Sequence, residues 1–255
     1  FFLGKAYNPE GFFPPEMAYT RELAEILASL GYQWVIIDEI AYAGKTEVVP
    51  YDTIFSLKDL PALRVFFRER RLSNLIMAAV VRSASSLKES LRGVPQTGRF
   101  FLTAMDGETF GHHRPGLEKL LAGIFASDYF NFLTISEIAS HVRKTGIIDP
   151  LTSTWASSEE EIASQRQFIS WNDPENQIHA MQWEFTNLAV SLVEKADQKA
   201  PWFGQVREKM DQALASDHMW WASAKPWWSL EMIERGAWRL LDIIRSLPAL
   251  PENIL

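Results

Sequence analysis

The fold class is decided by the stretch Gln33-Trp34-Val35-Ile36-Ile37-Asp38-Glu39. Its continuous apolar run ends on two acidic residues, which is typical of a strand that is buried on both faces of a parallel sheet. Gly31 ends a helical pattern over residues 17–30, in which one stripe is formed by Leu23, Ile26, Leu27 and Leu30. A helix followed by a buried strand is the repeating unit of a parallel α/β fold.

The same alternation continues through residues 1–146. After a loop that contains Gly44 and Pro50, we expect strands near 63–67, 100–105 and 130–134, and helices near 72–92, 115–126 and 136–144. Such alternation predicts a parallel sheet with right-handed crossovers. Because acidic residues repeatedly follow the strands, a (β/α) barrel or a fragment of one is favoured.

A second region differs in pattern. Residues 147–174 are polar and irregular, with Pro150 and Pro174, and are interpreted as a linker. Beyond it, helical patterns at about 175–199, 201–216 and 229–246 predict a helical bundle domain over residues 175–255.

Composition excludes several functions. The chain has 255 residues, 47% of them hydrophobic, and a formal charge of −7, which argues against binding to nucleic acid or an anionic membrane. It has no cysteine, hence no disulfide and no thiolate metal site, as in many cytoplasmic proteins. No apolar run approaches the roughly twenty residues of a membrane span.

Titratable residues gather in the stretch 100–113, Phe-Phe-Leu-Thr-Ala-Met-Asp-Gly-Glu-Thr-Phe-Gly-His-His. The apolar run leads to Asp106 and Glu108 on a glycine-containing loop. A carboxyl group in apolar surroundings has a raised pKa, as a general acid at neutral pH requires. The alternative is a polar loop with an Asx turn.

A second carboxylate follows the stretch Gly11-Phe12-Phe13-Pro14-Pro15-Glu16-Met17-Ala18-Tyr19. The two prolines end a strand and prepare the entry to a helix, so Glu16 lies at a strand-to-helix junction among aromatic residues. Taken alone, Glu16 is better explained by a favourable interaction with the helix dipole, but the presence of Asp106 favours a catalytic role.

Together the two motifs resemble glycoside hydrolase family 57, retaining enzymes that act on α-glucans. The resemblance implies that Glu16 is the nucleophile and Asp106 the general acid, 106 − 16 = 90 residues apart. It also implies an α-amylase, 4-α-glucanotransferase or branching-enzyme type of activity on an oligo- or polysaccharide, without a cofactor, and an incomplete seven-stranded barrel followed by helices. Similar segments recur at 66–74, 153–157, 171–176 and 220–228.

Two family motifs that precede the nucleophile, a His-containing segment and a Gly-Asn-x-Glu type segment, have no match in residues 1–15. We therefore expect the C-terminal part of a longer catalytic region, without its N-terminal strands. An exposed sheet edge would then favour an oligomer or require the missing segment. This keeps open a non-catalytic carbohydrate-binding remnant of the barrel.

Further residues are candidates for binding the sugar. Asp38 either binds a hydroxyl group or caps the following loop. Glu108 either holds Asp106 or contacts sugar, and one of His112 and His113 is expected to contact sugar. Adjacent histidines point apart on an extended backbone, and no His-x-x-x-His pair accompanies them, so no metal site is predicted. A metal-dependent polysaccharide deacetylase is the less favoured alternative.

Ten tryptophans offer platforms for pyranose rings. Trp155 on the linker and one of Trp220 and Trp221 are expected to face the cleft. The cluster also contains Trp227 and Trp228, and its four tryptophans are not expected to face the cleft together. His218 is interpreted as a core histidine. The segment Arg68-Glu69-Arg70-Arg71 is interpreted as a solvated turn with weak salt bridges.

Overall fold

The computed structural model describes residues 8–95, 98–225 and 228–248. The chain divides into two compact units, residues 1–167 and 168–255. The division falls inside the stretch 147–174 that the sequence predicts to be a linker. Among the described residues, no helix is both long and apolar enough to cross a membrane.

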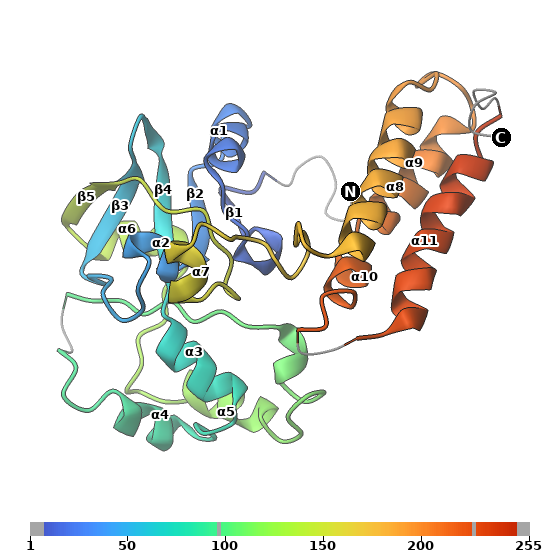
Figure 1. Ribbon diagram of the computed structural model, residues 1–255. Helices are drawn as coiled ribbons and strands as arrows, with labels where there is room; N and C mark the ends of the chain where they lie inside the picture. Colours follow the sequence, from blue (N-terminus) through green and yellow to red (C-terminus); the bar gives the residue numbers. More distant parts are fainter. Residues whose placement is uncertain (1–7, 96–97, 226–227, 249–255) are drawn as a thin grey trace. The chain divides into compact units, whose positions relative to one another are not determined.

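The first unit is built on a five-stranded, mostly parallel sheet (Figure 1). In spatial order its strands are β1 (Gly11–Phe12), β2 (Trp34–Asp38), β4 (Leu60–Arg68), β3 (Thr53–Leu57) and β5 (Lys144–Ile148). The pairs β1–β2, β2–β4 and β3–β5 are parallel. The predicted strands near 33–37 and 63–67 are therefore confirmed as β2 and β4.

The pair β3–β4 is antiparallel, so the expectation of a wholly parallel sheet is wrong here. Leu57 pairs with Leu60, which leaves only Lys58 and Asp59 to connect the two strands. A connection this short can only form a hairpin, since a parallel crossover needs a dozen residues or more. Asp59 adopts the left-handed conformation (φ 64°) that tight turns use.

Two of the expected strands do not form as regular strands. Residues 100–105 make one parallel bridge, between Leu102 and Arg68, and Phe100 N–H donates to the Tyr51 carbonyl (3.0 Å). Residues 130–134 are irregular. Instead, the fifth strand is β5, which lies in a stretch read as helix and linker. Ile147 is 79% exposed on this edge strand, so β5 lacks the buried apolar pattern that identifies a strand.

The described helices of this unit are α1 (Arg21–Ser29), α2 (Ile40–Ala43), α3 (Arg70–Met77), α4 (Ala84–Ser90), α5 (Glu118–Phe125), α6 (Ile135–His141) and α7 (Glu159–Ala163). The single helix expected over 72–92 is two helices, α3 and α4. The break follows from left-handed backbone at Ala79 (φ 55°) and from Ser83, which caps α4 by accepting from Ser86 N–H.

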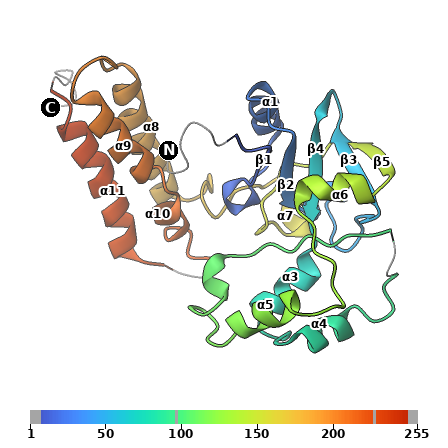
Figure 2. The same ribbon diagram turned by 180° about the vertical axis from the view of Figure 1, so that it is seen from behind.

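Each face of the sheet has its own apolar core, as the period-two alternation of strands requires. On one face, Val35 and Ile37 of β2 pack with Leu27 of α1. On the other face, Ile36 packs with Ile138 of α6. Figure 2 shows α6 in front of the strands, whereas α6 lies behind them in Figure 1.

A third cluster joins α3, α4 and α5, which lie side by side in both views. Its buried members are Leu72, Ile76, Val81, Leu87, Leu117, Leu120 and Ile124.

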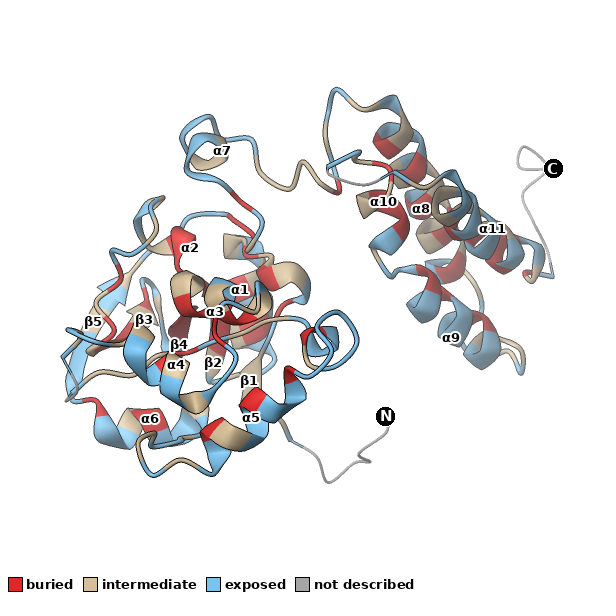
Figure 3. Ribbon diagram, turned by 90° about the horizontal axis from the view of Figure 1, so that it is seen from below, coloured by how far each residue is buried: buried red, intermediate tan, exposed pale blue. Residues whose placement is uncertain are grey.

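The described part of the second unit is helical. It contains α8 (Gln177–Glu194), α9 (Phe203–Ala213), α10 (Asp217–Trp220) and α11 (Leu230–Arg245). Buried positions lie on the inward sides of these helices (Figure 3), including Ala189, Val193, Val206, Met210, Leu240 and Ile243. The helical patterns near 175–199, 201–216 and 229–246 thus correspond to α8, α9 and α11.

Candidate active site

Glu16 lies in a 3-10 turn, Pro15–Met17, directly after β1. Glu16 (φ 56°, ψ 15°) and Met17 (φ 50°) are both in the left-handed region. Non-glycine residues in this region carry about 1–3 kcal/mol of strain each and persist only where surrounding contacts enforce them. Such strain is common where a side chain must be aimed at a ligand.

The contacts that enforce this turn come from the segment 153–155. Tyr19 and Ser153 form an antiparallel bridge, with Tyr19 N–H donating to the Ser153 carbonyl (2.8 Å). Trp155 N–H donates to the Glu16 carbonyl (3.1 Å). Burial raises the pKa of Tyr19 to about 12, so its phenol stays neutral and anchors the turn through packing.

The same segment brings a side chain to the Glu16 carboxylate. Trp155 Nε1–H donates to Glu16 Oε2 (2.7 Å), and the Trp155 ring meets Phe13 edge-on, with centroids 6.4 Å apart. A hydrogen bond to the charged form favours an ionised carboxylate. This hydrogen bond fixes the orientation of the Glu16 carboxylate.

Behind Trp155 lies a buried network of charges at the ends of β2 and β4. Arg68 Nη1 donates to Asp38 Oδ2 (2.9 Å), and Arg70 Nη2 donates to Asp38 Oδ1 (2.6 Å). Arg68 is 2% exposed and Glu69 5%. The interpretation of residues 68–71 as a solvated turn is wrong, because Arg68 and Glu69 are buried, and Arg68 and Arg70 both form ion pairs with Asp38.

Asp38 is fully buried and has four donors around its carboxylate. Besides the two arginines, Ile40 N–H donates to Asp38 Oδ1 (3.0 Å), which is the loop-capping contact that the sequence left open. Arg70 Nε adds a further bond (3.0 Å). A contact between Asp38 and a sugar hydroxyl would have to displace one of these donors.

Asp106 lies on an exposed loop, at the start of a 3-10 turn over Gly107–Thr109. The segment before it is fixed at three points. Glu69 N–H donates to the Leu102 carbonyl (2.7 Å), Ala104 N–H donates to Ser73 Oγ (3.2 Å), and Arg68 Nε donates to the Ala104 carbonyl (2.8 Å). The backbone is thus held two residues before Asp106, while its carboxyl group faces solvent.

Glu108, His112 and His113 are exposed on the same loop. The expectation that the two histidines point apart is wrong: their ring centroids are 5.2 Å apart, because the backbone turns here rather than running extended. Among the described residues, no group of three or more His, Asp or Glu side chains is arranged to hold a metal ion.

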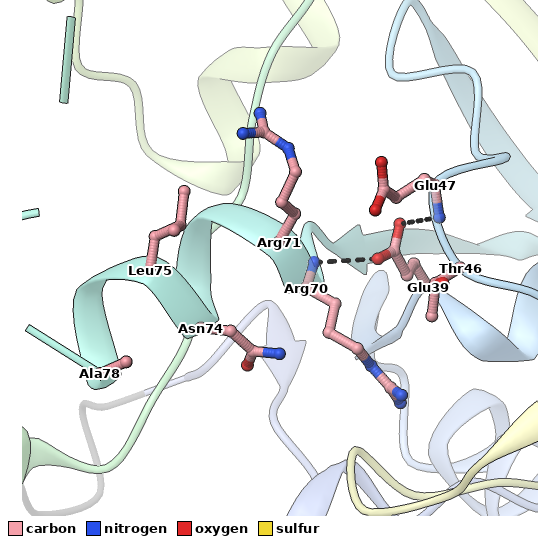
Figure 4. Close-up of a pocket in the computed structure, with 8 residues that line it drawn as sticks. All are labelled: Glu39, Thr46, Glu47, Arg70, Arg71, Asn74, Leu75 and Ala78. Atoms are coloured by element: carbon pink, nitrogen blue, oxygen red, sulfur yellow. Dashed lines mark hydrogen bonds between the residues drawn. The ribbon is translucent and has the colours of Figure 1, made fainter. Parts of the chain in front are cut away.

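A pocket of about 400 Å³ lies beside the charge network (Figure 4). It is lined by Glu39, Thr46, Glu47, Arg70, Arg71, Asn74, Leu75 and Ala78. None of these was singled out as a site residue from the sequence, although Glu39 directly follows β2. In Figure 4, Arg70 and Arg71 leave the first turn of α3 in opposite directions.

Glu39 is the buried carboxylate of this pocket. Its oxygens accept from Arg70 N–H (3.1 Å), Tyr51 O–H (3.0 Å) and Glu47 N–H (3.2 Å). Burial raises the pKa of Glu39 above its ordinary value, against these hydrogen bonds. Burial likewise raises the pKa of Glu69, which caps α3 by accepting from Leu72 N–H.

The tryptophan cluster belongs to the second unit. Trp220 and Trp221 are both half-buried, with perpendicular rings 5.1 Å apart, and Trp228 is 49% exposed. Trp227 lies outside the described residues. His218 is buried, as expected, and burial lowers its pKa. Which of Trp220 and Trp221 faces a sugar stays a prediction.

The geometry of the first unit is that of an α/β protein with carboxylates at the carboxyl ends of its parallel strands. The protein-family model for glycosyl hydrolase family 57 matches residues 3–150. The chain therefore belongs to this family. A comparison with curated proteins found no match.

Two solved structures share the fold over 98% of this chain. The 4-alpha-glucanotransferase from Thermococcus litoralis is 16% identical, with a TM-score of 0.61 and 44% of that chain covered. The alpha-amylase AmyC from Thermotoga maritima is 14% identical, with a TM-score of 0.63 and 62% of that chain covered. This chain thus spans about half the length of these two proteins.

Proposed function

We propose that this chain carries the two catalytic carboxylates of a retaining glycoside hydrolase or glucanotransferase that acts on α-linked glucan. Glu16 is the nucleophile and Asp106 the general acid and base. The family match includes both residues, and the similar solved structures are an amylase and a glucanotransferase. The observation that carries the assignment is the hydrogen bond from Trp155 Nε1–H to the Glu16 carboxylate.

The reaction proceeds by double displacement. A Glu16 oxygen attacks the anomeric carbon while the bond to the glycosidic oxygen breaks, and Asp106 transfers its proton to that departing oxygen. The product of this step is a glycosyl ester on Glu16. Asp106 then removes a proton from water or from an acceptor hydroxyl, which attacks the anomeric carbon and releases the Glu16 carboxylate.

Trp155 contributes in both steps. Its N–H orients the carboxylate before attack, and it stabilises the negative charge that returns to Glu16 when the ester is cleaved. Asp106 needs the opposite environment when it acts as an acid. A glucan chain bound over the exposed loop would remove water from Asp106 and favour its protonated form.

The proposal includes the architecture of the site. In it, the five-stranded sheet is part of the incomplete seven-stranded barrel of the family. Glu16, Asp38 and Arg68 follow or end the parallel strands β1, β2 and β4, and active sites of such sheets lie at that edge.

Paired substitutions test the roles of the two carboxylates. In the full chain, Asp106→Asn should lower turnover of an unactivated glucan by about 10²–10⁴-fold, the usual contribution of a general acid, and Glu16→Gln by at least about as much. Asp128→Asn is the matched control, because Asp128 is also exposed and lies outside both motifs. Azide should rescue Asp106→Asn on an activated α-glucoside and give an α-glycosyl azide.

Near-normal turnover in Asp106→Asn or Glu16→Gln would contradict the catalytic role assigned to the substituted residue. A chain that binds maltooligosaccharide without turning it over, in the wild type as in both variants, would instead support the carbohydrate-binding alternative.

A further inference from the structure

We propose that Arg68 is a positioning residue that holds Trp155 against Glu16 and, through the Ala104 carbonyl, holds the segment that carries Asp106. This inference rests on the proposed function, because it concerns the same two carboxylates. It assigns to one buried guanidinium group the task of fixing both catalytic segments with respect to each other.

The contacts of Arg68 reach both segments at once. Its Cζ atom lies over the Trp155 ring, 5.6 Å from the centroid, and Trp155 Nε1–H donates to Glu16 Oε2 (2.7 Å). On the other side, Arg68 Nε donates to the Ala104 carbonyl (2.8 Å), two residues before Asp106. A continuous chain of contacts therefore runs from Glu16 through Trp155, Arg68 and Ala104 towards Asp106.

The remaining donors fix Arg68 itself. Its Nη1 donates to Asp38 (2.9 Å) and its Nη2 to Asn74 Oδ1 (3.2 Å), so all three guanidinium nitrogens have a partner on a different element. Only arginine presents donors in this planar arrangement, and a single lysine ammonium group cannot reach the same three acceptors. With 3% of its side chain exposed, Arg68 has no freedom to act as a surface charge.

The position of the charge also strengthens the contact with Glu16. Asp38 is shared between Arg68 and Arg70, so one negative charge faces two guanidinium groups. The positive charge of Arg68 over the indole face attracts electron density from the ring. The indole N–H becomes a better donor, and its bond to the Glu16 carboxylate becomes stronger.

Arg70 supplies a strict control. It shares Asp38 with Arg68 and donates to the Ser157 carbonyl (3.0 Å), on the same loop as Trp155. Among the described residues, the Arg70 side chain makes no hydrogen bond to Ala104 and no cation–π contact with the Trp155 ring. Arg70 donates to Asp38 from two nitrogen atoms and Arg68 from one, so an effect that comes only from breaking the ion pair with Asp38 should be at least as large in Arg70→Met as in Arg68→Met.

The indole N–H resonance of Trp155 tests the contact without depending on activity. In a ¹H–¹⁵N correlation spectrum, the signal is assigned by its absence in Trp155→Phe. Glu16→Gln should move it upfield, because a neutral acceptor binds the proton less strongly. Arg68→Met should move it in the same direction and Arg70→Met should move it less. Unchanged positions in Arg68→Met and Arg68→Lys would overturn the proposal.

Kinetics of the full chain on a maltooligosaccharide test the consequence. Arg68→Met should lower kcat by about tenfold or more, with KM changed less than about threefold, as expected for an interaction that acts on the transition state. Arg68→Lys keeps the charge and should recover part of kcat. It also keeps the test valid if Arg68→Met does not fold. Equal losses in folded Arg68→Met and Arg70→Met would overturn the proposal.

The two proposals fail in different ways. If Glu16→Gln and Asp106→Asn keep normal activity, the proposed function is wrong, while the Trp155 resonance still decides whether Arg68 holds that side chain. If both variants lose activity but Arg68→Met keeps the wild-type kcat and Trp155 resonance, only the role of Arg68 is wrong.

Discussion

Replacing Asp38 by asparagine should destabilise the first unit by about 3 kcal/mol. Breaking a buried ion pair by removing one partner typically costs about 3–5 kcal/mol, since the other charge is left uncompensated. Asp38 is fully buried, and both of its arginines would lose their counter-charge. We take the lower end because the Arg70 side chain is 16% exposed and can turn towards water. Asparagine also directs N–H donors at these guanidinium groups, which accept no hydrogen bond.

Urea unfolding measures this change, and hydrogen exchange of the amides of β2 and β4 assigns it to the first unit alone. At about 2–4 °C per kcal/mol for a protein of this size, the midpoint of thermal unfolding should fall by about 6–12 °C. Glu25→Gln is the control, because the Arg21–Glu25 pair is exposed and should be worth about 0.5 kcal/mol or less. If Asp38→Asn lowers the free energy of unfolding by less than about 1 kcal/mol, the reasoning that Arg68 and Arg70 depend on Asp38 as their buried counter-charge is refuted.

Three further predictions concern the same unit. A Cβ atom at Gly11 would lie 2.0 Å from the Trp34 ring, so Gly11→Ala should cost about 1–3 kcal/mol in urea unfolding through a shift of β1; an unchanged midpoint would contradict this close approach. Burial raises the pKa of Glu39 above its ordinary value. Between these two pKa values the Glu39 side chain is protonated in the folded protein and ionised in the unfolded chain. The contribution of Glu39 to the free energy of unfolding therefore falls as the pH rises through this window. The stability of the wild type relative to Glu39→Gln should therefore decrease as the pH rises above the ordinary pKa of a glutamate in parallel urea titrations, and a constant or increasing difference would contradict the sign. Trp155→Phe removes one hydrogen bond to a charged group and should lower kcat by about tenfold or more, whereas a kcat within about twofold of wild type would show that the bond to Glu16 has no catalytic role.

The sequence correctly predicts the helices and strands whose secondary structure is determined by their own pattern of apolar residues. The continuous apolar run of β2 and the periodic stripes of α1, α8 and α11 do not depend on distant partners. The hairpin of β3 and β4 was missed because its turn, Lys58–Asp59, carries no glycine and no asparagine. The edge strand β5 was missed because one of its apolar residues, Ile147, faces solvent.

At the site, the motifs identify residues but not their contacts. The sequence predicts a place for Trp155 in the cleft, but it does not show that the indole N–H donates to Glu16, 139 residues earlier in the chain. Arg68 was assigned to a solvated turn because a run of four charges normally lies on the surface. Only the fold shows that the pairing of β2 with β4 places Asp38 beside Arg68. The two side chains then form a buried ion pair, although a run of charges in the sequence is typical of the surface.

The central claim, that Glu16 forms the covalent intermediate, is tested most directly by trapping that intermediate. A 5-fluoro-α-glucosyl fluoride reacts with a retaining α-glycosidase to leave a slowly hydrolysed glycosyl ester on the nucleophile. After proteolysis, mass spectrometry should find the added sugar on the peptide that contains Glu16, and none in Glu16→Gln. A label on Asp106, on Glu108 or on any other carboxylate, or an unlabelled active enzyme that releases product with inverted configuration, would contradict the account.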